Sequence, residues 1–353
     1  MSATAKHSSP VVTASERDPL PGSEYDLVSS RTMQKHGFMG PRATSEGRPM
    51  PQTIGHRGFK GAAPENTMTA FQAAAEAGVD AIETDLHLTR DGVVVLCHDK
   101  TLQRCFGNKA NVCDLDWDEI SQLRTIREPH QPMPRLVDLL HYLEQPGLEG
   151  IWLILDIKTH DDAEEIMKKI AEALASVPSK RPWSARVTPC CWNALYIKLS
   201  MKYLPDYPIT HVGFSTTYAR YLTDIPNISF SMLRHTLASP FGGRFLRDMK
   251  ALGIPVHVWT VNEESWMEWC IEKGLSGVIT DEVALFHDMC DRIGDGSQTQ
   301  AANKRRGKTP RLYRTARFYG EMVLFQFLVA IFMAAEFFKH GSPSHRINKA
   351  LKE

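Results

Sequence analysis

Short apolar runs alternate with longer amphipathic segments between residues 51 and 292. The runs are four to seven residues long, which is the length of buried β-strands, and several are rich in Val, Ile and Leu. We expect strands at 53–56, 81–86, 93–97, 151–157, 186–191, 209–214, 228–232, 256–261 and 277–280. We expect helices at 65–77, 116–123, 136–143, 161–176, 193–203, 243–252, 263–273 and 282–292. The alternation predicts a parallel α/β fold.

The alternating region is as long as a TIM (β/α)₈ barrel, and we predict that fold for residues 51–292. There are nine candidate strands, one more than the barrel needs, so one of them is accessory. A Thr-Arg-Asp-Gly turn joins the strands at 81–86 and 93–97 in a tight, hairpin-type connection. Because functional residues of TIM barrels lie at the C-terminal ends of strands, the ionisable residues at those ends are the candidates for a site.

Acidic residues stand inside two of the most apolar strands. Glu83 and Asp85 are two positions apart and project from one face of their strand, and Asp156 interrupts the run Leu-Ile-Leu-Asp-Ile. A buried carboxylate needs a cation or hydrogen bonds to compensate it. Three carboxylates at one barrel mouth are typical ligands of a hard divalent cation, Mg²⁺ or Ca²⁺, and the sequence does not choose between these two. A solvated acidic pair on an edge strand is the alternative for Glu83 and Asp85.

Two histidines end strands beside charged neighbours. His56 precedes Arg57, and His98 precedes Asp99. Two histidines near an acidic cluster favour acid/base catalysis over a structural role. Arg57 offers a planar fork for a phosphate and Lys158 offers a point charge, although either could instead neutralise the carboxylates.

Two further residues allow two interpretations each. Glu65 stands near an expected helix start, where a capping role competes with orienting Arg57. Trp259 is either part of the core or the apolar wall beside a substrate. The sequence leaves both alternatives open.

The composition changes outside the predicted barrel. Residues 1–50 are polar and rich in Ser, Pro and Arg, and we expect them to be disordered. Residues 293–318 form a linker with seven Lys or Arg and no acid between positions 304 and 317. Residues 319–339 are mostly apolar and predict a membrane segment, and residues 340–353 form a polar tail.

The formal net charge of zero hides an asymmetry. Residues 304–353 carry 11 Lys or Arg and 3 Asp or Glu, whereas the rest of the chain carries 30 and 38. A basic stretch before a hydrophobic segment predicts attachment to an anionic membrane, as a tail anchor or a shallow interfacial hairpin, with the catalytic domain in the cytosol. A soluble helix that covers the barrel is the alternative. Nucleic-acid binding is disfavoured, because no aromatic stacking platform accompanies the basic residues.

The seven cysteines form no Cys-x-x-Cys pair, and their number is odd. Several of them lie in apolar runs. We therefore predict buried free thiols in a reducing compartment rather than a disulfide framework.

Six motifs follow one another along the predicted barrel: Gly-His-Arg-Gly, Pro-Glu-Asn-Thr, Glu-Thr-Asp-Leu, His-Asp, Leu-Asp-Ile-Lys and Val-Trp-Thr-Val-Asn. Together they resemble the glycerophosphodiester phosphodiesterase family, which has a TIM barrel, a divalent metal and a catalytic histidine pair. The resemblance makes His56 and His98 the acid/base pair, Glu83, Asp85 and Asp156 the metal ligands, and Arg57 and Lys158 the phosphate contacts. The family usually has Glu at the position of Asp156, whose shorter side chain still offers an oxygen ligand.

With its basic, hydrophobic tail the chain most resembles the fungal phosphatidylglycerol phospholipase C branch. The resemblance implies cleavage of phosphatidylglycerol to diacylglycerol and glycerol phosphate, with a phospholipid membrane as the partner. The alternatives are a glycerophosphodiesterase or lysophospholipase D that acts on other glycerophospho-substrates, and a non-catalytic lipid-headgroup sensor. The candidate membranes are the endoplasmic reticulum, a lipid droplet and the mitochondrial surface, and the sequence indicates no oligomeric state.

Overall fold

The computed structural model describes residues 37–43 and 47–294, together with the single positions Gly320, Phe327, Ile331 and Ile347. Within this part of the chain, eight parallel strands close into a barrel, because the last strand pairs with the first. In barrel order the strands are β3 (Gln52–His56), β4 (Ala81–Leu88), β6 (Trp152–Ile157), β7 (Val187–Cys191), β8 (Ile209–Gly213), β9 (Ile228–Leu233), β10 (Val256–Trp259) and β11 (Gly277–Thr280). The predicted TIM barrel is confirmed.

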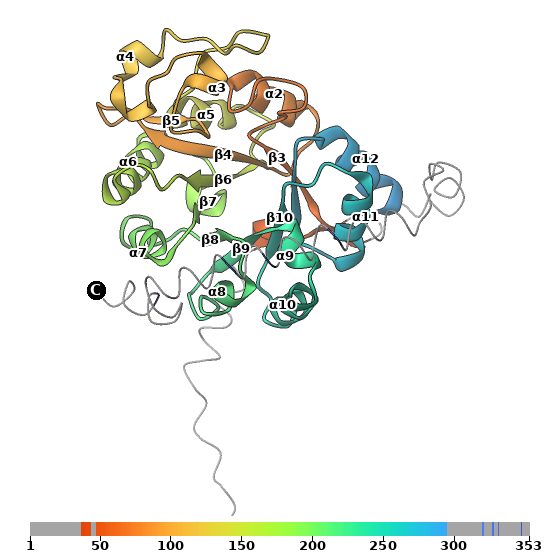
Figure 1. Cartoon of the computed structure of the whole chain (residues 1–353). Helices are drawn as coiled ribbons and strands as arrows, with labels where there is room; N and C mark the ends of the chain where they lie inside the picture. The colour runs from red at the N-terminus through yellow and green to blue at the C-terminus, as the bar shows by residue number, and fades with distance from the viewer. Residues whose placement is uncertain are drawn as a thin grey trace, which may run out of the picture.

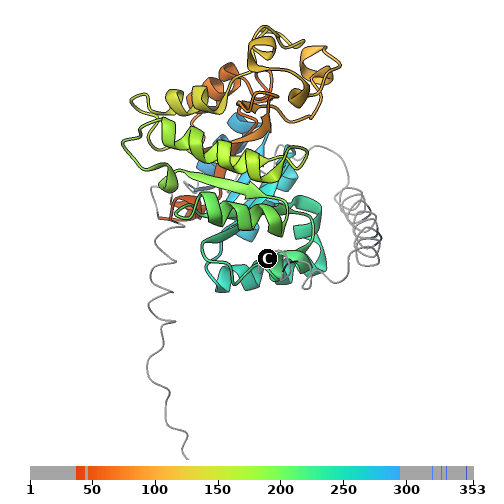
Figure 2. The same cartoon turned by 90° about the vertical axis from the view of Figure 1, so that its left-hand side faces the viewer.

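The ninth expected strand is the accessory one. Strand β5 (Val94–Leu96) pairs with β4 alone and runs antiparallel to it, with Leu96 opposite Leu86. Residues 97–135, which we call the excursion, follow β5 and hold α3 (Gln103–Phe106), η2 (Val112–Asp114) and α4 (Trp117–Ile120). The excursion has an apolar cluster of its own, made of Val95, Cys97, Leu102, Val112, Ile120 and Met133. It projects from one end of the molecule in both ribbon views (Figures 1 and 2).

Helices surround the barrel (Figure 1). They are α2 (Met68–Glu76), α5 (Leu136–Leu143), α6 (Ala163–Ser176), α7 (Ala194–Tyr203), α8 (Thr216–Arg220), α9 (Arg234–Ala238), α10 (Pro240–Ala251), α11 (Glu264–Lys273) and α12 (Val283–Gly294), with η3 (Trp183–Ala185) before β7. Capping side chains that accept backbone N–H groups set the first residues of α2, α6, α7, α8 and α10. Helix α2 starts three residues later than expected because Thr67 caps it, and α10 starts three residues earlier because Ser239 caps it and Pro240 is its first residue.

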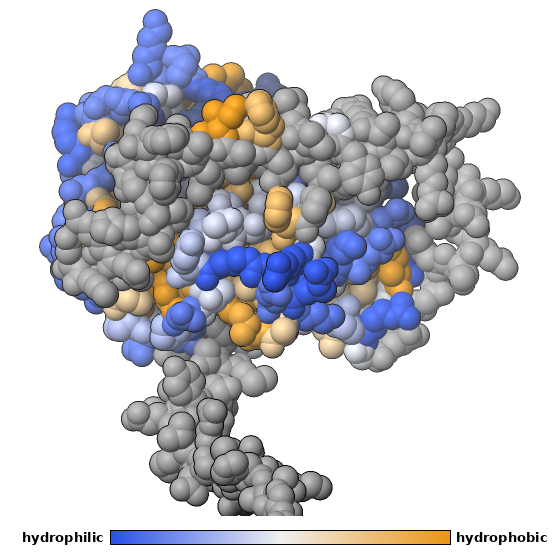
Figure 3. Space-filling model, turned by 60° about the horizontal axis from the view of Figure 1, so that its bottom comes forward, coloured by the Kyte–Doolittle hydropathy of each residue, from blue (hydrophilic) through white to orange (hydrophobic). Residues whose placement is uncertain are grey.

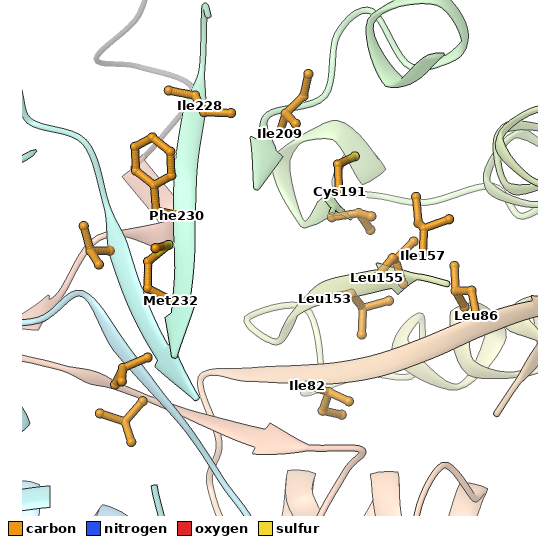
Figure 4. Packing of buried hydrophobic residues seen from close by; sticks show 14 of the residues in the cluster. Ile82, Leu86, Leu153, Leu155, Ile157, Cys191, Ile209, Ile228, Phe230 and Met232 are labelled. Atoms are coloured by element: carbon orange, nitrogen blue, oxygen red, sulfur yellow. The ribbon is translucent and has the colours of Figure 1, made fainter. Parts of the chain in front are cut away.

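Alternation along each strand separates the inside of the barrel from the outside. Ile82 and Leu86 of β4, and Leu153, Leu155 and Ile157 of β6, pack with the surrounding helices in the main apolar cluster (Figure 4). The residues between them, which include Glu83, Asp85 and Asp156, therefore face the interior. Below these carboxylates the interior is filled by apolar side chains, among them Ile54, Trp152, Ile154, Val212 and Ile279.

The N-terminal segment differs from the expectation of disorder over residues 1–50. A short helix η1 (Gly37–Met39) and the paired strands β1 (Arg42–Ala43) and β2 (Pro49–Met50) lie at the N-terminal end of the barrel. Met39 is fully buried in the interior cluster, and the carbonyl oxygens of Phe38 and Met39 accept hydrogen bonds from Gln52 and His257. Barrel side chains thus satisfy the polar backbone of this segment, which its composition did not reveal. Residues 1–36 and 44–46 lie outside the described residues.

The predicted linker 293–318, membrane segment 319–339 and polar tail 340–353 lie almost entirely outside the described residues and stay predictions. No helix in the described part of the chain is long and apolar enough to cross a membrane. Of the described tail positions, Ile347 is buried in the main apolar cluster. On the face seen in Figure 3, hydrophobic residues of the described surface form separate patches among hydrophilic ones. All seven cysteines are described and are free thiols, as predicted, but only five are buried: Cys113 is exposed and Cys105 is partly buried.

Candidate active site

The predicted site residues gather around one cavity of about 130 Å³ at the C-terminal ends of the barrel strands. Of the nine residues named from the sequence, eight line this cavity, and Glu65 lies behind it. The lining residues are His56, Arg57, Glu83, Asp85, His98, Ile154, Asp156, Lys158, Cys190, Trp192, Val212, Ser231, Trp259, Thr260 and Ile279. They come from strands on every side of the barrel, so only the closed fold assembles the site.

The three carboxylates form a compact, buried group. Oxygen atoms of Glu83, Asp85 and Asp156 all lie within 4.8 Å of one another. Burial raises the pKa of Glu83 well above its ordinary value, and repulsion from Asp85 and Asp156 adds to the rise. Burial also opposes ionisation of Asp85, but the charges of Lys158 and Arg57 outweigh it and hold the pKa of Asp85 far below its usual value.

This carboxylate group fits a hard divalent cation. It offers only oxygen donors, and it faces two protein cations, Arg57 and Lys158, which leaves an excess of one negative charge when all three acids are ionised. The raised pKa of Glu83 shows that the protein alone does not compensate the third charge. Asp156, the residue that is shorter than the family's usual Glu, is close enough to belong to the group.

Lys158 and Arg57 both bind the acidic group from the sides. Lys158 Nζ lies 2.6 Å from Asp85 Oδ1 and 2.5 Å from Asp156 Oδ2. Burial would lower the pKa of Lys158, but these two carboxylates raise it above its ordinary value, so the side chain stays charged. Lys158 therefore neutralises carboxylates and also lines the cavity, and its contact with a phosphate stays a prediction.

Arg57 has a positive φ angle, and the N–H at its Nε atom makes no hydrogen bond to the described residues. Its φ is +57°, and its backbone N–H donates to Glu83 Oε2 over 2.9 Å. Its Nη1 donates to Glu65 Oε1 over 2.7 Å. Its Nε lies 3.3 Å from Asp85 Oδ2, yet this buried N–H makes no hydrogen bond to the described residues. The guanidinium charge of a residue that lines the cavity is suited to an anionic ligand.

His56 is bound to the carboxylate of Asp281, which lies 225 positions later in the sequence, directly after the last barrel strand. Its Nδ1 lies 2.6 Å from Asp281 Oδ1. Asn262 donates from Nδ2 to the other oxygen of Asp281 over 2.9 Å and so fixes that carboxylate. Burial lowers the pKa of His56 even though Asp281 opposes the change. With Nδ1 bound to Asp281, the Nε2 atom of a neutral His56 remains available as a base.

His98 is also bound to a carboxylate through Nδ1. Its Nδ1 lies 2.7 Å from Oδ1 of Asp99, its neighbour in the chain. The other oxygen of Asp99 accepts from Arg104 Nε over 2.6 Å. Burial lowers the pKa of His98, while the charge of Asp85 opposes the change.

Glu65 orients arginines and does not cap a helix. Thr67 occupies the capping position of α2, and the Glu65 carboxylate accepts hydrogen bonds from Arg57 and Arg104. Burial would raise the pKa of Glu65, but the hydrogen bonds and charges of the two arginines lower it to about 2. The interpretation that Glu65 orients Arg57 is the one that the contacts support.

Trp259 is part of the cavity wall. Its ring lies 6.1 Å from that of Trp192 in an edge-to-face arrangement, and its Nε1 donates to Ser231 O over 3.1 Å. Trp192 in turn donates from Nε1 to Asp156 Oδ1 over 2.8 Å. The two indoles line the same cavity as the histidines.

Sequence reasoning missed several residues that support the site. Asp281 and Trp192 each follow directly after a barrel strand, so the rule applied to His56 would have found them. Asn66, which donates to Asp85 Oδ2 over 2.8 Å, stands beside Glu65 in the Pro-Glu-Asn-Thr motif. The sequence around Arg104 did not indicate a role at the site, because nothing in it shows that the excursion folds back over the site.

Fold and site together define a TIM-barrel phosphodiesterase. The family model "Glycerophosphoryl diester phosphodiesterase family" matches residues 56–285, and the chain belongs to this family. A probable glycerophosphodiester phosphodiesterase 2 of Mycobacterium tuberculosis is 30% identical over 257 residues, which cover 69% of this chain and 91% of that protein. The mouse lysophospholipase D GDPD1 is 26% identical, over 68% of this chain and 86% of its own length.

Solved structures have the same fold. A phosphodiesterase of Oleispira antarctica, solved in complex with the product sn-glycerol-3-phosphate, superposes with a TM-score of 0.61 at 23% sequence identity. The match covers 69% of this chain and 97% of that one. Members of the family are phosphodiesterases, and this chain is a phosphoric diester hydrolase.

Proposed function

We propose that the protein is a metal-dependent phospholipase C-type hydrolase that cleaves phosphatidylglycerol to diacylglycerol and glycerol phosphate. The observation that carries this proposal is the cavity itself, in which two carboxylate-bound histidines flank an acidic group and two cations. A phosphodiester placed among these groups has a base on one side and an acid on the other.

In this mechanism His56 accepts the proton of the nucleophile. Its lowered pKa keeps the imidazole neutral near pH 7, and Asp281 holds the ring through Nδ1. The nucleophile is either the 2-hydroxyl of the headgroup, which gives a cyclic phosphate that water then opens, or water itself.

His98 donates a proton to the departing alkoxide. The negative charge of a bound phosphodiester stabilises the imidazolium form of His98 and offsets the effect of burial on its pKa. Asp99 holds its Nδ1 and leaves Nε2 to face the leaving group.

Arg57 and Lys158, which both line the cavity, bind the phosphate through their positive charges. Glu83, Asp85 and Asp156 would hold the divalent cation, Mg²⁺ or Ca²⁺. When bound, such a cation neutralises negative charge on phosphate oxygens.

Phosphatidylglycerol is a glycerophosphodiester whose leaving alcohol is diacylglycerol, so it presents a glycerol phosphate group to the site. The inner side of the cavity, next to Trp192, Trp259 and Ser231, would take the glycerol headgroup. The product in the Oleispira antarctica structure is a glycerol phosphate, which supports a glycerol phosphate group as part of the substrate.

A second candidate is lysophospholipase D activity, which the name of the mouse relative suggests. That reaction retains an acylglycerol phosphate instead of a bare glycerol phosphate. A cavity of about 130 Å³ suits the smaller group better, which is why we place this candidate second.

The membrane partner is also part of the proposal. The basic stretch at 304–317 and the apolar stretch at 319–339 would attach the enzyme to an anionic membrane, with the barrel in the cytosol. The endoplasmic reticulum, a lipid droplet and the mitochondrial surface are the candidate locations.

A lipid-class assay tests the proposal. The full-length protein is incubated with vesicles that contain phosphatidylglycerol, phosphatidylcholine and lysophosphatidylcholine, with and without a chelator, and the products are identified by mass spectrometry. We expect diacylglycerol and glycerol phosphate from phosphatidylglycerol, no turnover after chelation, and recovery with Mg²⁺ or Ca²⁺. A cyclic glycerophosphate would identify the headgroup hydroxyl as the nucleophile. Lysophosphatidic acid with intact phosphatidylglycerol would instead establish the second candidate.

A further inference from the structure

Arg104 of α3 connects two parts of the active site that lie on different elements. Its Nε donates to Asp99 Oδ2 over 2.6 Å, and Asp99 holds His98. Its Nη1 and Nη2 donate to Glu65 Oε2 and Oε1 over 2.8 and 2.7 Å, and Glu65 holds Arg57. One guanidinium therefore contacts two of the three carboxylates that orient a residue of the mechanism, the third being Asp281.

Arg104 makes more hydrogen bonds to carboxylates than an ordinary surface ion pair does. Arg104 binds Glu65 in the bidentate fashion for which a guanidinium is suited, and it uses a third nitrogen for Asp99. The Glu65 side chain is only 9% exposed, so this contact is shielded from solvent screening. Burial would raise the pKa of Asp99, but the hydrogen bonds from Arg104 and His98 lower it to about 2. Both carboxylates consequently stay ionised.

We propose that Arg104 is a positioning residue for phosphodiester hydrolysis, which fixes Asp99 and Glu65 so that His98 and Arg57 face the same phosphate. Arg104 does not touch the substrate in this proposal, and it does not line the cavity. The inference rests on the proposed roles of His98 and Arg57. It gives the excursion a function, since α3 brings Arg104 over the end of the barrel.

The proposal predicts two separable effects. Through Asp99, Arg104 supports proton donation by His98, which matters only when the leaving group is a poor one such as an alkoxide. Through Glu65, it supports phosphate binding by Arg57, which matters for every diester. A purely structural role would lower turnover of all substrates alike.

Two soluble glycerophosphodiesters measure these effects: glycerophosphoethanol, whose leaving group is an alkoxide, and glycerol p-nitrophenyl phosphate, whose leaving group needs no proton. For the full-length Arg104→Gln variant we expect kcat on glycerophosphoethanol to fall about 30-fold or more. On the p-nitrophenyl ester we expect kcat to change less than threefold and KM to rise severalfold. Equal losses of kcat on both substrates would overturn the proposal.

Arg90→Gln is the matched control. Arg90 is 54% exposed against 48% for Arg104, and it also bridges two carboxylates, Asp116 and Glu119, which belong to the excursion and do not contact the site. We expect wild-type kinetics from this variant. A loss with Arg90→Gln as large as that with Arg104→Gln would show that the excursion is merely being destabilised.

Asp99→Asn keeps the experiment decisive if Arg104→Gln does not fold. We expect Asp99→Asn alone to show the same selective loss on glycerophosphoethanol. Where Arg104→Gln does fold, we expect it to lower kcat no further when it is combined with Asp99→Asn. Independent, multiplying losses would contradict a path through Asp99. Neither ester is a membrane lipid, so the outcome does not depend on whether phosphatidylglycerol is the physiological substrate.

Discussion

His56 and His98 are each bound through Nδ1 to a carboxylate, but they differ in exposure. The His56 side chain is 12% exposed and its partner Asp281 is fixed by Asn262, whereas His98 is 36% exposed and its partner Asp99 is fixed by Arg104. A buried imidazole is easier to keep neutral, and a more exposed one is easier to protonate. This difference supports His56 as the base and His98 as the acid.

Replacing either histidine with alanine should remove most of the activity. We expect His56→Ala and His98→Ala each to lower kcat by about 10²–10⁴-fold, since each change removes one proton-transfer group. A p-nitrophenyl leaving group should restore turnover in His98→Ala but not in His56→Ala.

His141→Ala, a change on the exposed side of α5, serves as the control in the same steady-state assay, with circular dichroism to verify folding. If either catalytic variant kept near-normal turnover of an alkoxide diester, the acid/base pairing would be wrong.

A different histidine should make stability depend on pH. His257 is fully buried, burial lowers its pKa from 6.5 to about 4, and its Nδ1 has no hydrogen-bond partner among the described residues. In the unfolded chain, His257 therefore binds a proton as the pH falls below 6.5. In the folded chain it binds that proton only near pH 4. Stability present at neutral pH should be lost as the pH falls through this window, by about 3 kcal/mol in all.

Denaturant unfolding at several pH values measures this effect. We expect His257→Gln, which keeps an N–H donor for Met39 O but does not titrate, to have a shallower pH dependence than the wild type between pH 6.5 and 4. Identical slopes for the two proteins would show that His257 does not control acid stability.

At the scale of elements, the N-terminal segment contributes a buried side chain, that of Met39, to the interior of the barrel. Met39 of η1 is fully buried in the cluster that fills the barrel interior, next to strands β3 and β6. We expect Met39→Ala to lower the free energy of unfolding by about 2–4 kcal/mol, because it leaves a cavity in a packed interior.

Met201→Ala, on an exposed part of α7, is the matched control and should change stability by less than about 0.5 kcal/mol. If the Met39 and Met201 variants had the same free energy of unfolding in urea, packing of Met39 would not contribute to the stability of the barrel.

The sequence predicted the helices and strands better than it predicted which strands pair and which distant residues contact one another. The barrel strands follow from apolar runs, and the five groups of the acidic and histidine site follow from strand ends, because both signals are local. The accessory strand β5 could not be told from a barrel strand, since pairing with β4 alone is a property of the closed sheet. Contacts such as His56 with Asp281 and Gln52 with Phe38 join distant segments, and local patterns do not encode them.

At the scale of the whole molecule, the site is on the barrel and the proposed membrane attachment is on the tail. Deleting residues 304–353 should lower turnover of phosphatidylglycerol in vesicles about tenfold or more and leave soluble glycerophosphodiesters unaffected, because only the vesicle reaction needs attachment.

Since Ile347 is buried in the main apolar cluster, a second variant keeps that position and replaces the seven basic residues at 304–317 with Gln. It should bind anionic vesicles more weakly in a sedimentation assay. Undiminished vesicle activity in both variants would contradict a membrane role for the tail.

Closure of the barrel by its first and last strands also matters while the protein is being made. His56 and Asp281 are separated by 225 positions, and β3 has no second neighbour until β11 is available. At 5–20 residues per second, a ribosome needs about 10–45 s to add that length. During this interval a strand edge stays open and the histidine lacks its carboxylate. The site is thus incomplete on a nascent chain until β11 and Asp281 have been synthesised, and pairing of β11 with β3 completes it.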